Sequence, residues 1–171
     1  MIKGLYPFGL NHYRSLKFQK LRKLISKNQK KIKVEGAYGS SLSFLLIDIF
    51  SSINQQIFYI SNSKETASYV YSDIVELIGE INCSFLPSNY RSDAKKIKDE
   101  SNIINRSKTI RDILDKETKI IVTYPEAIFE KIPNEKEIDS KTINIEKGQF
   151  LKINSINELL FDLKFEKDDY V

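Results

Sequence analysis

The chain has 171 residues, 41% hydrophobic and 29% charged, which is the composition of a globular protein. A single cysteine, Cys83, excludes an internal disulfide, and a single histidine, His12, excludes a zinc site of the Cys₂His₂ type. No apolar run approaches the roughly 20 residues of a membrane span. The N-terminus lacks the pattern of a signal peptide. We therefore expect a cytoplasmic protein with no membrane partner.

The net charge of +4 is distributed unevenly. Residues 1–34 hold ten Lys or Arg and no acid, whereas the remainder holds 17 basic and 23 acidic residues. A basic leader on an acidic body predicts contact with phosphates or with an acidic partner, although the same lysines could serve only as a solvated helix face. The candidate DNA-binding residues are Lys17, Lys20, Arg22, Lys23, Lys27 and Lys30.

The first part of the chain is predicted to alternate between helices and strands. Apolar residues at helical spacing indicate an amphipathic helix over 14–27, within a basic leader of residues 1–30. The pair Ile32 and Val34 predicts a strand over 31–35, and residues 42–50 follow the pattern of a one-faced helix.

A third helix follows the apolar strand predicted at 57–60. Asn62 and Glu65 have the spacing of a capping box that would open this helix, and Gly79 would end it. Residues 81–86 then predict a strand that contains Cys83, which we expect to be a buried, inert thiol.

The chain continues with a predicted loop over 88–98, a helix over 99–115 and a strand over 119–123. Pro125 suits the first turn of a short helix that runs to about residue 131. Such alternation predicts an α/β domain over 31–135 with a doubly wound, mainly parallel sheet.

The pattern changes after Pro133. Residues 135–139 indicate a charged linker, 142–146 a short strand and 147–149 a turn. Ser155 and Glu158 predict a second capping box that opens a leucine-rich helix. We interpret residues 136–171 as the start of a second, α+β module that is truncated.

The segment from Gly36 to Ser43 has the context of a phosphate-binding loop, G-x-x-x-x-G-K-[ST], between a strand and a helix. Ser41 replaces the second glycine, and Leu42 replaces the lysine that would contact the β- and γ-phosphates. We predict a vestigial loop that binds no cofactor, formed by Gly36, Gly39, Ser40, Ser41, Leu42 and Ser43. Alternatively, Gly36 and Gly39 only form a tight turn.

Several stretches together resemble the N-terminal region of the bacterial transcription-repair coupling factors, the Mfd family. They are Gly36–Leu46, Phe85–Ser88, the helix that contains Asn105 and Arg106, Ile121–Ala127, Lys147–Gln149 and Asp169–Val171. The resemblance implies a P-loop fold of the UvrB or helicase type that lacks ATPase motifs. Residues 31–135 would correspond to the UvrB-like domain 1a, and residues 136–171 to the start of domain 2.

The resemblance also implies a function. The chain would be a non-catalytic scaffold and interaction fragment of a protein that displaces stalled RNA polymerase at DNA lesions and recruits UvrA for nucleotide-excision repair. The family's UvrA determinants would fall mostly beyond Val171, and the contacts with RNA polymerase and DNA in other regions. ATP and Mg²⁺ would bind only in the parent's C-terminal translocase domains.

Two other functions remain open from the residues. A nucleotide-dependent enzyme with a variant phosphate loop would take its cation from Arg91, Lys95 or Lys96, and would hold Mg²⁺ through Asp48 or Glu126. A small nucleic-acid-binding module would use the basic leader, whose interleaved aromatic residues are Tyr6, Phe8, Tyr13 and Phe18. Phe18 also fits the apolar face of the leader helix.

Overall fold

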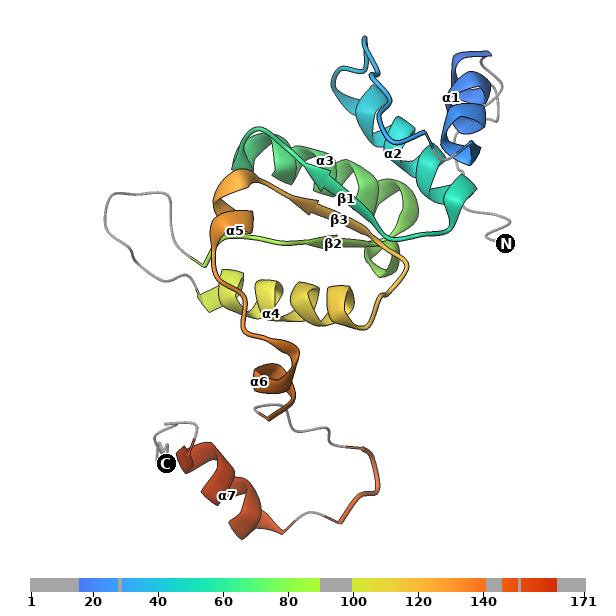
Figure 1. Cartoon of the computed structure of the whole chain (residues 1–171). Coiled ribbons are helices and arrows are strands. Elements are labelled where there is room, and N and C mark those ends of the chain that lie inside the picture. The colour runs from blue at the N-terminus through green and yellow to red at the C-terminus, as the bar shows by residue number, and fades with distance from the viewer. Residues whose placement is uncertain (1–15, 28, 90–99, 141–145, 151, 163–171) are drawn as a thin grey trace. The chain divides into compact units, whose positions relative to one another are not determined.

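The computed structural model describes residues 16–27, 29–89, 100–140, 146–150 and 152–162. It is a mixed α/β protein with a small parallel sheet and mostly helices (Figure 1). The chain divides into two compact units, residues 1–131 and 132–171. This division lies next to Pro133, where the sequence pattern changes.

Three strands form the sheet in the first unit. They are β1 (Ile57–Ile60), β2 (Cys83–Phe85) and β3 (Ile120–Thr123), in the order β1-β3-β2 with both pairs parallel. The predicted parallel α/β architecture and the strands at 57–60 and 119–123 are therefore confirmed. β2 is shorter than predicted because Glu80–Asn82 form a 3₁₀ turn directly after Gly79.

Two crossover helices, α3 (Lys64–Ile78) and α4 (Glu100–Leu114), lie on opposite faces of this sheet (Figure 1). α3 packs on β2 and β3 through an apolar face that includes the fully buried Ile74. The contacts of α4 with β2 are partly polar, because the Thr109 hydroxyl donates to the Phe85 carbonyl at 2.7 Å and the Ser84 hydroxyl to Asp112 at 2.6 Å. Both helices were predicted at these positions.

The N-terminal cap of α3 differs from the prediction by one residue. Ser63, not Asn62, is the N-cap, and its hydroxyl accepts a hydrogen bond from the Thr66 amide at 3.3 Å. Both residue types cap helices well, so the sequence alone favours neither. Gly79 ends the helix with φ 81°, as predicted.

The leader helix α1 (Leu16–Ser26) and helix α2 (Ser40–Ile53) complete the first unit with α5 (Pro125–Phe129). α2 packs on α3 and α1 packs on α2, where Leu21 is buried. The predicted strand over 31–35 is wrong, since these residues form no strand. Ile32 instead lines a cleft together with apolar residues of α1, and Val34 remains 48% exposed.

The described part of the second unit contains two helices and a turn. α6 (Glu135–Ser140) corrects the predicted linker and starts with a reciprocal capping box, in which Asn134 and Glu137 exchange hydrogen bonds of 2.9 and 3.0 Å. Gly148 lies in the predicted turn with φ 95°. α7 (Ile153–Asp162) begins two residues before Ser155, so the predicted capping box there is wrong. Residues 142–145 of the predicted strand lie outside the described residues.

Candidate functional site

The segment Gly36–Ser43, predicted to be a vestigial phosphate loop, has the glycine geometry of a turn into a helix, but no strand precedes it. Gly36 and Gly39 have φ angles of 84° and 54°, a region that favours glycine, and Gly39 is the N-cap of α2. Ser40 is the first residue of the helix, and the Ser41 hydroxyl donates to the Tyr38 carbonyl at 2.6 Å. A phosphate loop takes its position from a strand of the sheet, and this loop lacks that support.

The last two residues of the loop belong to the packing of the fold. Leu42 packs against the hydrophobic core. Ser43 is fully buried, and its hydroxyl donates to a carboxylate oxygen of Asp73 on α3 at 3.0 Å. The hydroxyl at the position that would hold Mg²⁺ is therefore committed to a contact between two helices.

The two acids considered as Mg²⁺ ligands lie in different environments. Asp48 is 2% exposed, and the Arg22 guanidinium forms a bidentate ion pair with it, in which Nε lies 3.0 Å from Oδ2. Glu126 is exposed in the first turn of α5. The Asp48 carboxylate is thus committed to Arg22, which argues against the metal role considered for it. Arg91, Lys95 and Lys96 lie outside the described residues.

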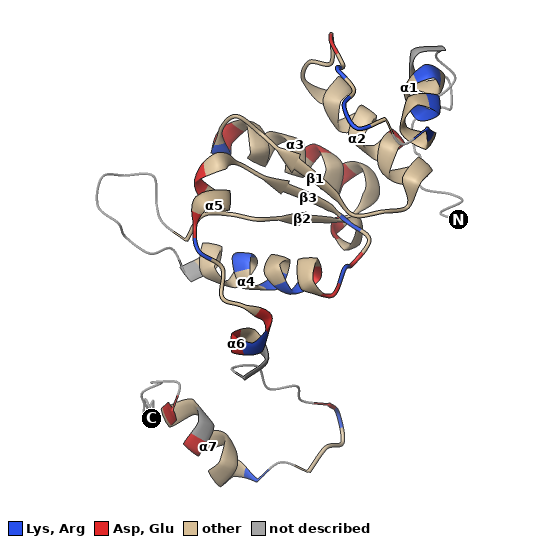
Figure 2. Ribbon diagram, viewed as in Figure 1, with Lys and Arg blue, Asp and Glu red and all other residues tan. Residues whose placement is uncertain are grey.

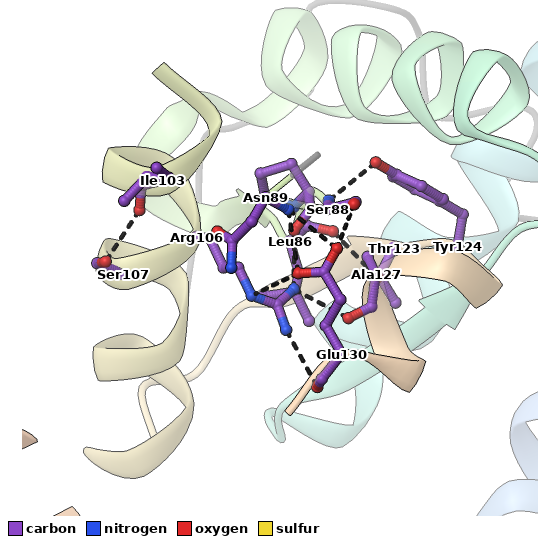
Figure 3. Close-up of polar contacts among 11 residues, drawn as sticks. Leu86, Ser88, Asn89, Ile103, Arg106, Ser107, Thr123, Tyr124, Ala127 and Glu130 are labelled. Carbon is purple, nitrogen blue, oxygen red and sulfur yellow. Dashed lines mark hydrogen bonds and ion pairs between the residues drawn. The ribbon is translucent and has the colours of Figure 1, made fainter. Parts of the chain in front are cut away.

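The carboxyl edge of the sheet carries a buried polar network centred on Arg106 (Figure 3). Arg106 is 2% exposed and donates to the carbonyl oxygens of Pro87 at 2.8 Å and Ala127 at 2.9 Å. Its Nε lies 3.6 Å from the Glu130 carboxylate, which also accepts hydrogen bonds from the Ser88 hydroxyl and the Asn89 amide. We call these residues the Arg106 network.

Burial sets the proton affinities at this edge. It lowers the pKa of Arg106, while the nearby Glu130 carboxylate acts in the opposite direction. Burial raises the pKa of Tyr124, whose hydroxyl accepts a hydrogen bond from the Ser88 amide at 2.9 Å. Arg106 and Tyr124 both hold the loops that follow β2 and β3 through these hydrogen bonds.

Ligands of open α/β sheets bind beyond the carboxyl ends of the strands. At this edge the space between the strand ends of β2 and β3 is taken by the protein's own side chains, with Thr123 also donating to the Leu86 carbonyl at 3.1 Å. The sequence analysis did not single out Arg106 or Glu130 as partners. They lie 24 residues apart, and no spacing rule pairs them.

Lys and Arg recur along α1 in the basic leader (Figure 2), and most of the described leader residues are exposed. The residues Lys20, Lys23, Lys27 and Lys30 are exposed, whereas Arg22 is partly buried against Asp48. Lys17 lies in α1, but its side chain is outside the described residues, as are Tyr6, Phe8, Tyr13 and His12. Phe18 is half-buried, which agrees with an apolar helix face more than with a stacking platform.

A cleft of about 470 Å³ lies between α1, the segment 32–37 and the start of α2; we call it the leader cleft. Its apolar lining includes Phe18, Leu21, Leu24, Ile32, Val34 and Leu45. The charged residues Lys20, Lys33 and Glu35 also line it, and the side chains of Lys33 and Glu35 pair with each other.

Cys83 is buried in the core, and burial raises the pKa of its thiol to about 12. The thiolate is the reactive form, so this cysteine is inert at neutral pH, as the sequence predicted. Among the described residues, no three His, Cys, Asp or Glu side chains gather as metal ligands would.

Within the same described ranges, none of the helices has the length and apolar character needed to cross a membrane. Comparison of the sequence with models of known protein families, and with curated protein sequences, finds no match.

Proposed function

We propose that this chain is a non-catalytic scaffold and interaction fragment of a transcription-repair coupling factor. Its parent protein would act in the cytoplasm, displace RNA polymerase stalled at DNA lesions and recruit UvrA. The parallel α/β sheet, with helices on both faces, supports the finer proposal that the first unit derives from a doubly wound P-loop fold of the UvrB type.

The observation that carries this proposal is that residues of the predicted phosphate loop form contacts within the fold. Leu42 packs against the core and supplies no cation for a phosphate. The Ser43 hydroxyl is buried on Asp73, and Asp48 is paired with Arg22. A nucleotide would have to break these contacts before it gained any of its own.

We expect the chain to bind Mg-ATP with a dissociation constant above about 1 mM, and to show no ATP hydrolysis. A missing charge-assisted hydrogen bond costs about 1.5–3 kcal/mol, and the loop lacks its lysine. Isothermal titration calorimetry of the full chain measures the affinity directly. Saturable binding in the low micromolar range would contradict the scaffold proposal and favour the variant P-loop enzyme.

A matched pair of variants locates any nucleotide binding that is observed. Leu42→Lys restores the missing cation but removes a core contact, so we expect lower stability and no hydrolysis. Glu126→Gln removes the exposed acid at the sheet edge without loss of packing. ATP binding that Leu42→Lys strengthens and Glu126→Gln abolishes would identify a functional nucleotide site.

The second candidate function, binding of nucleic acid, is favoured by the exposed lysines of the leader. Residues 16–33 contain no acidic residue, and Lys20, Lys23, Lys27 and Lys30 are exposed. Such a surface binds phosphates without reading bases. It is a weaker candidate because Arg22, one of the six predicted contacts, pairs with Asp48 instead.

We expect weak DNA binding that depends steeply on salt. If about four leader cations meet phosphates, log K falls against log salt with a slope near −3.6. Reversing the charge of Lys23, Lys27 and Lys30 to Glu should flatten the slope and abolish binding to a short duplex. The matched control reverses three exposed lysines elsewhere, Lys108, Lys116 and Lys131. Equal losses in both triple variants would show that only net charge matters.

A further inference from the structure

We propose that the leader cleft is a docking site for an acidic, amphipathic helix of a partner protein. The helix would insert apolar side chains between α1 and the segment 32–37, and its carboxylates would face the leader lysines. The proposal goes beyond the scaffold role, because it assigns a partner class to a cleft for which the resemblance implies no partner.

The cleft is suited to apolar side chains. Its volume of about 470 Å³ lies in the range of protein sites that enclose a ligand or a few side chains. Phe18, Leu24 and Ile32 are only partly buried, and Val34 is 48% exposed. Tyr38, one residue beyond the cleft wall at Ala37, is 83% exposed and offers an aromatic contact at the rim.

The charge around the cleft selects an acidic occupant. Lys20 lines it, and the exposed lysines Lys23, Lys27 and Lys30 continue the same sign of charge along the leader. Lys33 and Glu35 also line the cleft, and they form an ion pair with each other at 2.5 Å, so their charges offset and the excess positive charge comes from the leader lysines. Complementary potentials across an interface steer association and exclude partners of the wrong sign.

The length of the lysine-rich surface, together with the apolar lining of the cleft, favours a helical segment over a small anion or DNA. α1 has 11 residues, which is about 16 Å of helix, and a small anion would reach only one end of this cationic surface. A phosphate backbone would leave the apolar lining unfilled. An amphipathic helix supplies both parts, with apolar anchors three and four residues apart on one face and acids on the other.

Fluorescence anisotropy with the full chain tests the proposal. The probe is a labelled synthetic helix of about 14 residues, with Leu and Phe at i, i+3, i+4 and i+7 and Glu elsewhere. We expect a dissociation constant of about 10–100 μM. Val34→Asp should weaken binding at least about tenfold, and Lys20→Glu about three- to tenfold.

Matched controls carry the same changes at distant exposed positions. Ile81→Asp and Lys108→Glu should change the affinity by less than about twofold, since Ile81 is 80% exposed and neither residue lines the cleft. Circular dichroism of each variant verifies the fold. If Val34→Asp unfolds the chain, the affinities of Lys20→Glu and Lys27→Glu test the same proposal. Of these two lysines only Lys20 lines the cleft, so its variant should bind the probe more weakly.

Four results would overturn the proposal. One is the absence of binding at a probe concentration of about 1 mM. Another is equal binding of a scrambled peptide of the same composition without an apolar face. Equal loss in Lys20→Glu and Lys27→Glu, with Val34→Asp unchanged, would reduce the effect to general electrostatics. Tighter binding of a DNA duplex that is indifferent to Val34→Asp would assign the leader to nucleic acid.

Discussion

Replacing Arg106 by Leu should destabilise the first unit by about 3–5 kcal/mol, a large part of the stability of a typical domain. The change leaves the carbonyl oxygens of Pro87 and Ala127 without their donor, and it leaves the Glu130 carboxylate, whose side chain is 15% exposed, without its cation. Urea unfolding followed by circular dichroism measures the loss as a lower midpoint at unchanged slope.

Two variants separate the role of Arg106 from helix propensity and from charge. Lys108→Leu, on the exposed side of the same helix, should stay within about 0.5 kcal/mol of the unsubstituted chain. Glu130→Gln should cost less than Arg106→Leu, because an amide oxygen can still accept from Ser88 and Asn89. A stable Arg106→Leu variant would contradict a structural role and indicate a cation kept for a ligand, since such functional residues are often retained at a cost in stability.

Most of the helices and strands of the first unit could be predicted because their signals are local. The Pro125 that opens α5 and the Gly79 that ends α3 each act on their own backbone. α6 was missed because its residues have no apolar face, and a capping box between Asn134 and Glu137 marks its start instead.

The strand predicted over 31–35 failed for a reason that is not local. An alternation of Ile32 and Val34 with lysines predicts a strand only if a sheet edge receives it. Here residues 31–35 pair with no strand, and Ile32 lines the leader cleft together with apolar residues of α1.

The contacts of the candidate site residues were even harder to predict, because their partners lie far away in the sequence. The loop residues Leu42 and Ser43 were identified from spacing, but Asp73, which fixes Ser43, lies 30 residues away. One signal was available, because Asp48 interrupts the apolar run from Phe44 to Phe50. An acid in such a run is rarely buried without a partner, although the sequence does not say that the partner is Arg22.

The second large effect is expected at the ion pair of Arg22 and Asp48. Arg22→Ala should destabilise the first unit by about 2–3 kcal/mol, less than a fully buried pair would lose, because the Arg22 side chain is 37% exposed. The carboxylate of Asp48 would remain at 2% exposure without its bidentate partner, and α1 would lose a contact that holds it on α2. Thermal unfolding should show a midpoint lower by several degrees, about 2–4 °C for each kcal/mol.

Variants of Arg22, Asp48 and Lys23 distinguish a role of Arg22 in stability from a role in DNA binding. Lys23→Ala, at the adjacent exposed position, should leave the free energy of unfolding within about 0.5 kcal/mol and reduce DNA binding. Arg22→Met combined with Asp48→Leu should recover part of the stability lost in Arg22→Ala, since apolar residues can replace a buried ion pair. If Arg22→Ala instead weakened DNA binding and left thermal unfolding unchanged, Arg22 would be a phosphate contact, and its pairing with Asp48 would contribute little to the fold.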